Sequence, residues 1–204
     1  MRYLTAILLA IMLMFSLQSL ADDEKKEENK LKVGDPAPNF ILKDPLDKEY
    51  ELKKILDKEE GTAKVVFLLI GTRKVQKMGD EWTFGLEEIY GKKEDIKVFL
   101  MGDLRGLPFF VTKGMVKWGA KGENERLPAT ILLDWKGKVS KKYDTEKDKP
   151  NLIIIDSDMK IAYKKVVDNF TKEAVKEVVE VVEKALKKAD AEDSEAKENI
   201  EQKE

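Results

Sequence analysis

The residues best suited to chemistry lie in one turn, where an apolar run (Val65–Ile70) gives way to a segment with helical spacing. Backbone N–H groups converge at such a strand–turn–helix junction, and many α/β proteins bind ligands there. The turn and the segment after it contain three cations, a hydroxyl and a thioether: Gly71, Thr72, Arg73, Lys74, Lys77 and Met78. Cations near a helix N-terminus are unfavourable, because that end of the helix dipole is already positive. Residues that are unfavourable for local structure often lie at functional sites, so these cations indicate function. We expect the turn to bind an anion or an acidic segment of a partner protein.

Two other stretches complete this candidate binding turn. Asp103 and Arg105 follow a second apolar run, Ile96–Met101, and Pro150 begins a third. We expect a cleft between the turn and the Pro150 loop. A second interpretation stays open, because long basic side chains on a lysine-rich surface also extend into solvent without binding anything.

Composition removes the most familiar catalytic groups. The 204 residues include no cysteine and no histidine, which excludes thiolate nucleophiles, disulfides, cysteine-ligated metals and an imidazole base. We therefore expect that the protein is not an enzyme and that it binds neither a cofactor nor a metal ion. The alternative is an enzyme that uses carboxylates such as Asp80, Glu81 or Asp103, although acids are too abundant here for their position to be informative. A formal net charge of −2 argues against a nucleic-acid partner.

The first residues predict export. Arg2 precedes a mostly apolar stretch, Ala6–Leu17, and the small residues Ser19 and Ala21 precede Asp22. This pattern is typical of a secretory signal peptide cleaved after Ala21. An uncleaved anchor is the weaker interpretation, because the apolar run is shorter than the roughly 20 residues that a membrane span requires. We expect a periplasmic or secreted protein with no stable membrane anchor after cleavage.

Composition also divides the chain into four parts. Residues 1–21 form the predicted signal peptide, and 22–31 are charged and almost free of apolar residues, as in a solvated linker. Residues 32–187 form the predicted domain. Residues 188–204 form a charged tail, which we expect either to fray or to project as a solvated helix.

Hydrophobic periodicity predicts an alternation of strands and helices in the domain. Two bulky, unalternated runs are typical of parallel strands buried on both faces, and the helical spacing between them predicts a βαβ crossover. The predicted helices are a short one at Lys53–Asp57, one from the candidate turn to Ile89, one at Phe109–Trp118 and one after Thr171. Lys121–Arg126 is predicted to be a polar loop.

A short sequence pattern that occurs twice predicts two β-hairpins. Residues 128–134 and 150–156 share a pattern of proline, two residues, three aliphatic residues and aspartate, and each is interpreted as strand, Asp-led turn and strand. Asp156 and Asp158 are interpreted as turn residues and not as metal ligands. Among the bulky side chains, Met78, Trp82 and Met101 have the spacing of core residues. An exposed pair at Trp118 and Trp135 would favour a protein interface.

The element order resembles the thioredoxin-like fold with the N-terminal extension of peroxiredoxins and TlpA-type proteins. The stretch VGDPAPNF (33–40) resembles the entry segment of the AhpC/TSA and redoxin families, and LDWKGKVSKKY (133–143) resembles their D-x-x-G-x-x-x-x-x-Y stretch. Pro150 with 153–156 resembles the strand that begins with a cis proline in thioredoxin-like proteins. Among the subfamilies, the chain resembles the exported YtfJ type. The resemblance covers residues 32–187 and implies an α/β fold with a central mixed β-sheet flanked by helices.

The resemblance ends at the redox centre. Met78 stands where peroxiredoxins have the peroxidatic cysteine, and Lys74 and Lys77 stand where thioredoxin-type proteins have a Cys-x-x-Cys pair. Neither side chain forms a thiolate, so no catalytic residue carries over. We therefore expect a non-redox binding or accessory protein with an unknown protein or anionic ligand. The alternative is a protein grouped with peroxiredoxins and redoxins by similarity, active only when its partners supply thiols.

Overall fold

The chain divides into a unit that ends at Leu31 and a unit that begins at Lys32, and all the elements below belong to the second unit. The structure, a computed structural model, describes residues 30–58, 60–91 and 93–201. The predicted signal peptide (1–21) and residues 22–29 of the predicted linker lie outside the described residues. No described helix is both long and apolar enough to cross a lipid bilayer.

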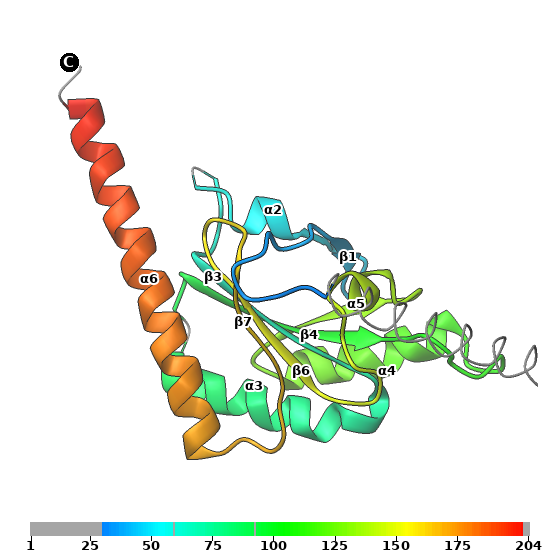
Figure 1. The fold of residues 1–204 in the computed structure, drawn as a ribbon. Helices are drawn as coiled ribbons and strands as arrows, with labels where there is room; N and C mark the ends of the chain where they lie inside the picture. The colour runs from blue at the N-terminus through cyan, green and yellow to red at the C-terminus, as the bar shows by residue number, and fades with distance from the viewer. Residues whose placement is uncertain (1–29, 59, 92, 202–204) are drawn as a thin grey trace, which may run out of the picture. The chain divides into compact units, whose positions relative to one another are not determined.

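A mixed β-sheet of five strands forms the centre of the second unit (Figure 1). Its strands are β3 (Val65–Gly71), β4 (Ile96–Asp103), β5 (Thr130–Asp134), β6 (Asn151–Ile155) and β7 (Ile161–Val166). The order is β5-β4-β3-β6-β7, in which β3, β4 and β5 are parallel and β6 is antiparallel to both β3 and β7. Because Val65–Ile70 is apolar throughout, β3 occupies the centre and is buried on both faces. The predicted α/β fold and the βαβ crossover are confirmed.

Helices flank this sheet, and a small hairpin precedes it. The helices are α2 (Leu52–Ile55), the 3₁₀ turn η1 (Arg73–Val75), α3 (Gln76–Tyr90), α4 (Lys113–Arg126), α5 (Lys138–Lys142) and α6 (Lys172–Glu201). The hairpin pairs β1 (Ile41–Lys43) with β2 (Glu49–Glu51) and provides the predicted N-terminal extension. Helices α3 and α6 pack on one face of the sheet, where Trp82 and Val182 share a core with Phe67. The Trp82 indole N–H donates to the carbonyl of Asp168 at 3.0 Å.

Helix α6 continues through most of the predicted tail. Thr171 caps it, since its hydroxyl accepts the N–H of Ala174 at 3.3 Å, as the sequence predicts. The helix extends to Glu201, and Ala189 within the tail is only 3 % exposed. Ion pairs of 2.7 and 2.8 Å join Lys64, just before β3, to Asp190 and Asp193 of α6. The part of the tail around Ala189 therefore packs on the folded unit.

The predicted bounds of the helix Phe109–Trp118 are wrong, and the residues predicted to form a polar loop after it belong to the helix. Helix α4 begins at Lys113 because the hydroxyl of Thr112 accepts the N–H of Met115, and it continues to Arg126. Phe109 belongs to a turn that the N–H of Val111 closes on the carbonyl of Pro108. The hydroxyl of Thr112 at the N-cap thus sets where this helix starts.

The first of the two predicted hairpins is also wrong. After β5, a turn through Gly137 (φ 61°) leads into α5 and not into a second strand. The carboxylate of Asp134 accepts the N–H groups of Lys138 and Ser140, which satisfies donors at the start of that helix. The second hairpin is confirmed, because β6 and β7 are antiparallel partners joined by a turn at Asp156.

Candidate functional site

The candidate residues gather at the carboxyl edge of the three parallel strands. Gly71 of β3 lies opposite Gly102 of β4, and Asp103 at the end of β4 lies opposite Asp134 of β5. Pro150 precedes β6, whose first residue pairs with Ile70 of β3. The topology thus brings together three stretches that are far apart in the sequence, at the edge where α/β proteins commonly bind ligands.

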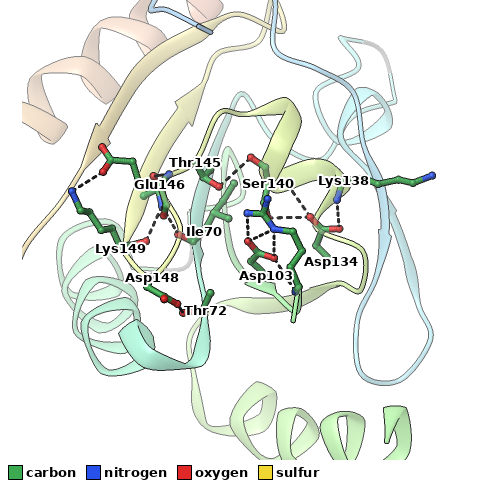
Figure 2. A network of polar contacts seen from close by, with 12 residues as sticks. Ile70, Thr72, Asp103, Asp134, Lys138, Ser140, Thr145, Glu146, Asp148 and Lys149 are labelled. Atoms are coloured by element: carbon green, nitrogen blue, oxygen red, sulfur yellow. Dashed lines mark hydrogen bonds and ion pairs between the residues drawn. The ribbon is translucent and has the colours of Figure 1, made fainter. Parts of the chain in front are cut away.

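A buried amide joins the Pro150 loop to the end of β3. Asn151 is 4 % exposed, and its Nδ2 donates to the carbonyls of Ile70 at 3.2 Å, Glu146 at 3.0 Å and Lys149 at 2.7 Å. Its Oδ1 accepts the N–H of Glu146 at 2.9 Å. Figure 2 shows Glu146 and Lys149 gathered beside Ile70. The Pro150 loop is therefore held against the candidate turn, and all described peptide bonds, including that of Pro150, are trans.

The same loop supplies a carboxylate to the turn. Asp148 Oδ1 accepts the hydroxyl of Thr72 at 2.8 Å (Figure 2). Its Oδ2 accepts Lys74 Nζ at 2.7 Å. These contacts, with Lys74 first, lower the pKa of the Asp148 carboxyl. Lys74, whose side chain is 74 % exposed, is therefore partly neutralised by a carboxylate of the protein itself. Sequence reasoning did not identify Asp148 as its partner.

The other two cations of the turn differ from Lys74. Lys77 Nζ lies 4.0 Å from the carboxylate of Glu81, and the Lys77 side chain is 91 % exposed. Arg73 is exposed in the 3₁₀ turn η1, and within residues 30–58, 60–91 and 93–201 its guanidinium makes no hydrogen bond or ion pair. Met78, predicted to fill core volume, is only half-buried, whereas Trp82 and Met101 are fully buried as predicted.

Arg105 is bound to Asp103 by two nitrogens. Its Nε lies 2.8 and 2.9 Å from the two carboxylate oxygens, and its Nη2 also donates to Asp103, which is 5 % exposed. These hydrogen bonds raise the pKa of Arg105. A Cβ at Gly137 would lie 1.9 Å from the Arg105 side chain, so glycine leaves room for the arginine there. Both charged groups thus have a structural role at this edge.

The acids proposed for non-thiol catalysis each have a different cation as partner. Asp80 pairs with Arg126, Glu81 lies near Lys77, and Asp103 binds Arg105. Among the described residues no group of three or more acidic side chains is placed to hold a metal ion. Figure 2 places Asp103 near Asp134, but Asp134 is occupied with Ser140, whose hydroxyl donates to it at 3.0 Å.

Asp156 and Asp158 belong to the turn between β6 and β7. Asp156 Oδ1 accepts the N–H groups of Asp158 and Lys160 at 3.1 and 2.9 Å, the pattern of an aspartate-led turn. Both carboxylates also pair with Lys188 of α6. A cavity of about 510 Å³ lies near this turn, at the amino ends of β3 and β4, with Lys64 and Ser157 in its lining. It is thus at the opposite end of the sheet from the candidate turn.

Trp118 and Trp135, which would favour a protein interface if both were exposed, have different environments. Trp118 on α4 is 83 % exposed. Trp135 is half-buried, and Lys113 Nζ lies 5.5 Å from its ring centroid. The two side chains therefore do not form an exposed pair, because a cation on α4 and the apolar contacts of the small core around Leu133 cover Trp135.

Known structures resemble this one in fold. A candidate protein disulfide isomerase from Bacteroides thetaiotaomicron superposes with a TM-score of 0.57 at 18 % identity, covering 77 % of this chain and 91 % of that one. A peroxiredoxin-like protein from Aquifex aeolicus gives 0.53 at 20 %, covering 76 % and 88 %. Peroxidoxin BcpB from Mycobacterium tuberculosis gives 0.50 at 18 %, covering 79 % and 97 %.

Comparisons of the amino-acid sequence with known proteins find no match. No protein-family model matches the chain, and no curated protein matches it. Thiol chemistry is absent, because the chain has no cysteine anywhere, including the turn after β3. The structural comparisons and the sheet order together identify a thioredoxin-like fold without redox cysteines.

Proposed function

We propose that this protein is an exported binding or accessory protein without redox activity, and that the turn Gly71–Lys77 receives a carboxylate of an acidic partner. The unpaired guanidinium of Arg73 carries the proposal, since it is the cation of the turn that remains available to a ligand in the described part of the chain. Export rests on the N-terminal sequence, which lies outside the described residues.

The surroundings of Arg73 support this role. Neither η1 nor α3 has a side-chain hydrogen bond at its N-cap, so no side-chain oxygen of the described residues caps the start of this helical segment. The hydrogen bond between Thr72 and Asp148 joins the turn to the loop before β6, and Asn151 fixes that loop. A preorganised turn loses little conformational freedom on binding, which favours recognition of a single charged group.

The pairing of the neighbouring cations limits the strength of the site. Lys74 already has Asp148 as a partner and Lys77 is near Glu81, so we expect Arg73 to dominate. A charge-assisted hydrogen bond is worth about 1.5–3 kcal/mol, which corresponds to roughly tenfold to a hundredfold in affinity. We therefore expect weak binding of a single carboxylate and tighter binding of an acidic peptide that also reaches Lys77.

Amide chemical shifts provide the test. Titration with sulfate and with a short polyglutamate peptide should move the signals of residues 71–77, and the peptide should saturate. Arg73→Gln combined with Lys77→Gln should weaken peptide binding about tenfold or more. Lys184→Gln is the matched control, because Lys184 is an exposed lysine on α6. Equal affinity of the wild type and the double variant, with Lys184→Gln also unchanged, would refute the proposed site.

A further inference from the structure

A cluster of exposed apolar side chains surrounds the start of helix α4. In order of exposure, its members are Phe109 at 100 %, Trp118 at 83 %, Phe110 at 65 %, Met115 at 58 % and Leu107 at 36 %. We call these five residues the aromatic patch. All five lie within the twelve positions 107–118 of the chain, and large apolar side chains concentrated on a surface mark a contact site.

The patch is built on a loop tip and on the outer face of a helix. Phe109 and Phe110 contact each other edge to face, with ring centroids 5.7 Å apart. On α4, Val116 and Ala120 pack toward the small core, so the spacing of three residues places Met115 and Trp118 together on the side away from it. Positions 119 and 122 of the helix are also open, since a Cβ at either glycine would meet no described atom within 4 Å beyond its chain neighbours and the backbone of the helix itself.

The chain around the patch is basic. Residues 104–122 contain Arg105, Lys113, Lys117 and Lys121 but no acidic residue, although the whole chain has 40 acids against 38 basic residues. Lys117 has a partner in Asp47, and Arg105 has one in Asp103. Cations interleaved with exposed aromatic side chains are the pattern of proteins that lie in a membrane interface, where lysines contact anionic headgroups.

We propose that the aromatic patch binds reversibly to the surface of a lipid bilayer with anionic headgroups. This role goes beyond the proposed function, since it concerns a different surface and does not depend on Arg73. Phe109, Phe110 and Trp118 enter the interfacial layer, where a Trp ring is stable with its apolar body in the lipid and its N–H in water. Lys113 and Lys121 remain at the level of the headgroups.

The shape and charge of the patch favour lipid over the other occupants. A second copy of the chain would bring two identical basic stretches face to face, and like charges repel. A protein partner would need a pocket shaped for Phe109, whose side chain is 100 % exposed and contacts the ring of Phe110. A fluid lipid layer closes around a projecting side chain of any shape, and its anionic headgroups complement the lysines.

Fluorescence of Trp118 tests the proposal in the full chain. Vesicles of phosphatidylcholine in which about one lipid in three is phosphatidylglycerol should shift Trp118 emission to shorter wavelength. Lipids brominated on the acyl chain should quench it, and salt should weaken both effects. The difference between the wild type and Trp118→Phe isolates this signal from the buried Trp82 and half-buried Trp135. It also separates contact through the patch from contact through the apolar N-terminal stretch.

Variants of the patch complete the experiment. Phe109→Ser with Phe110→Ser should weaken the partition of Trp118 into anionic vesicles by about tenfold or more, because two apolar rings no longer leave water. Phe84→Ser is the matched control, since Phe84 is an exposed phenylalanine on α3 outside the patch. A Trp118 signal that stays unchanged with anionic vesicles would refute the proposal, and so would equal partition of the wild type and the double variant. A response to polyglutamate and not to vesicles would also refute it, because it would indicate a protein partner.

Discussion

Replacement of Asn151 with alanine tests whether one buried amide holds the carboxyl edge of the sheet together. The side chain is 4 % exposed and joins the end of β3 to the loop that carries Asp148. Alanine removes the amide without introducing a charge or a larger side chain. The buried carbonyl of Ile70 and the N–H of Glu146 then lose their contacts with this group.

The expected loss of stability follows from the four contacts of this amide, three from Nδ2 and one to Oδ1. A hydrogen bond in a folded protein contributes about 1 kcal/mol net, and a buried group left unpaired costs about 1–3 kcal/mol. Because the two hydrogens of Nδ2 are shared among three carbonyl acceptors, these four contacts amount to fewer than four full hydrogen bonds. Asn151→Ala should therefore lower the free energy of unfolding by about 3 kcal/mol.

Urea denaturation measures this change, and Asn39→Ala is its matched control. Asn39 is an exposed asparagine that also makes two hydrogen bonds, with Glu51 and with the N–H of Lys53. Water replaces those contacts after substitution, so the control should lose about 1 kcal/mol or less. A loss below about 1 kcal/mol in Asn151→Ala, or an equal loss in both variants, would contradict the role of the buried amide.

Two helical glycines and one turn aspartate give further predictions. At Gly85 a Cβ would lie 2.1 Å from Cζ of Phe170, so Gly85→Ala should cost about 1–3 kcal/mol in a urea melt. At Gly119 a Cβ would meet no described atom within 4 Å beyond its chain neighbours and the helix backbone, so Gly119→Ala should stabilise by about 0.5–1 kcal/mol. A change of the same sign at both positions would show that local packing does not set the effect. Hydrogen bonds from two lysines, Lys188 first, lower the pKa of Asp158 from 3.8 to about 2. The charged form stabilises the fold above pH 3.8, and this contribution disappears as the pH falls toward about 2. Asp158→Asn should therefore be less stable than the wild type near neutral pH and equally stable near pH 2; a gap that persists at low pH would contradict this cause.

Local patterns predicted the elements whose burial is uniform or periodic. Val65–Ile70 is apolar at every position, and such a run is stable only between two covered faces, so its place at the centre of the sheet followed directly. Helix α6 was found because Val178, Val182 and Ala185 recur on one face. Helix α5 was missed, because the residues after Gly137 have no apolar periodicity and depend on the carboxylate of Asp134 for their start.

The sequence by itself determined that this protein performs no thiol chemistry, because a residue type missing from the chain is missing from every fold of it. It also located the turn after β3. Only the tertiary structure decided which cations of that turn are available. Lys74 is joined to Asp148 across 74 positions of the chain, whereas Arg73 remains exposed. Among 40 acids, no local pattern selects that partner, because charge pairing depends on distances that exist only after the chain has folded.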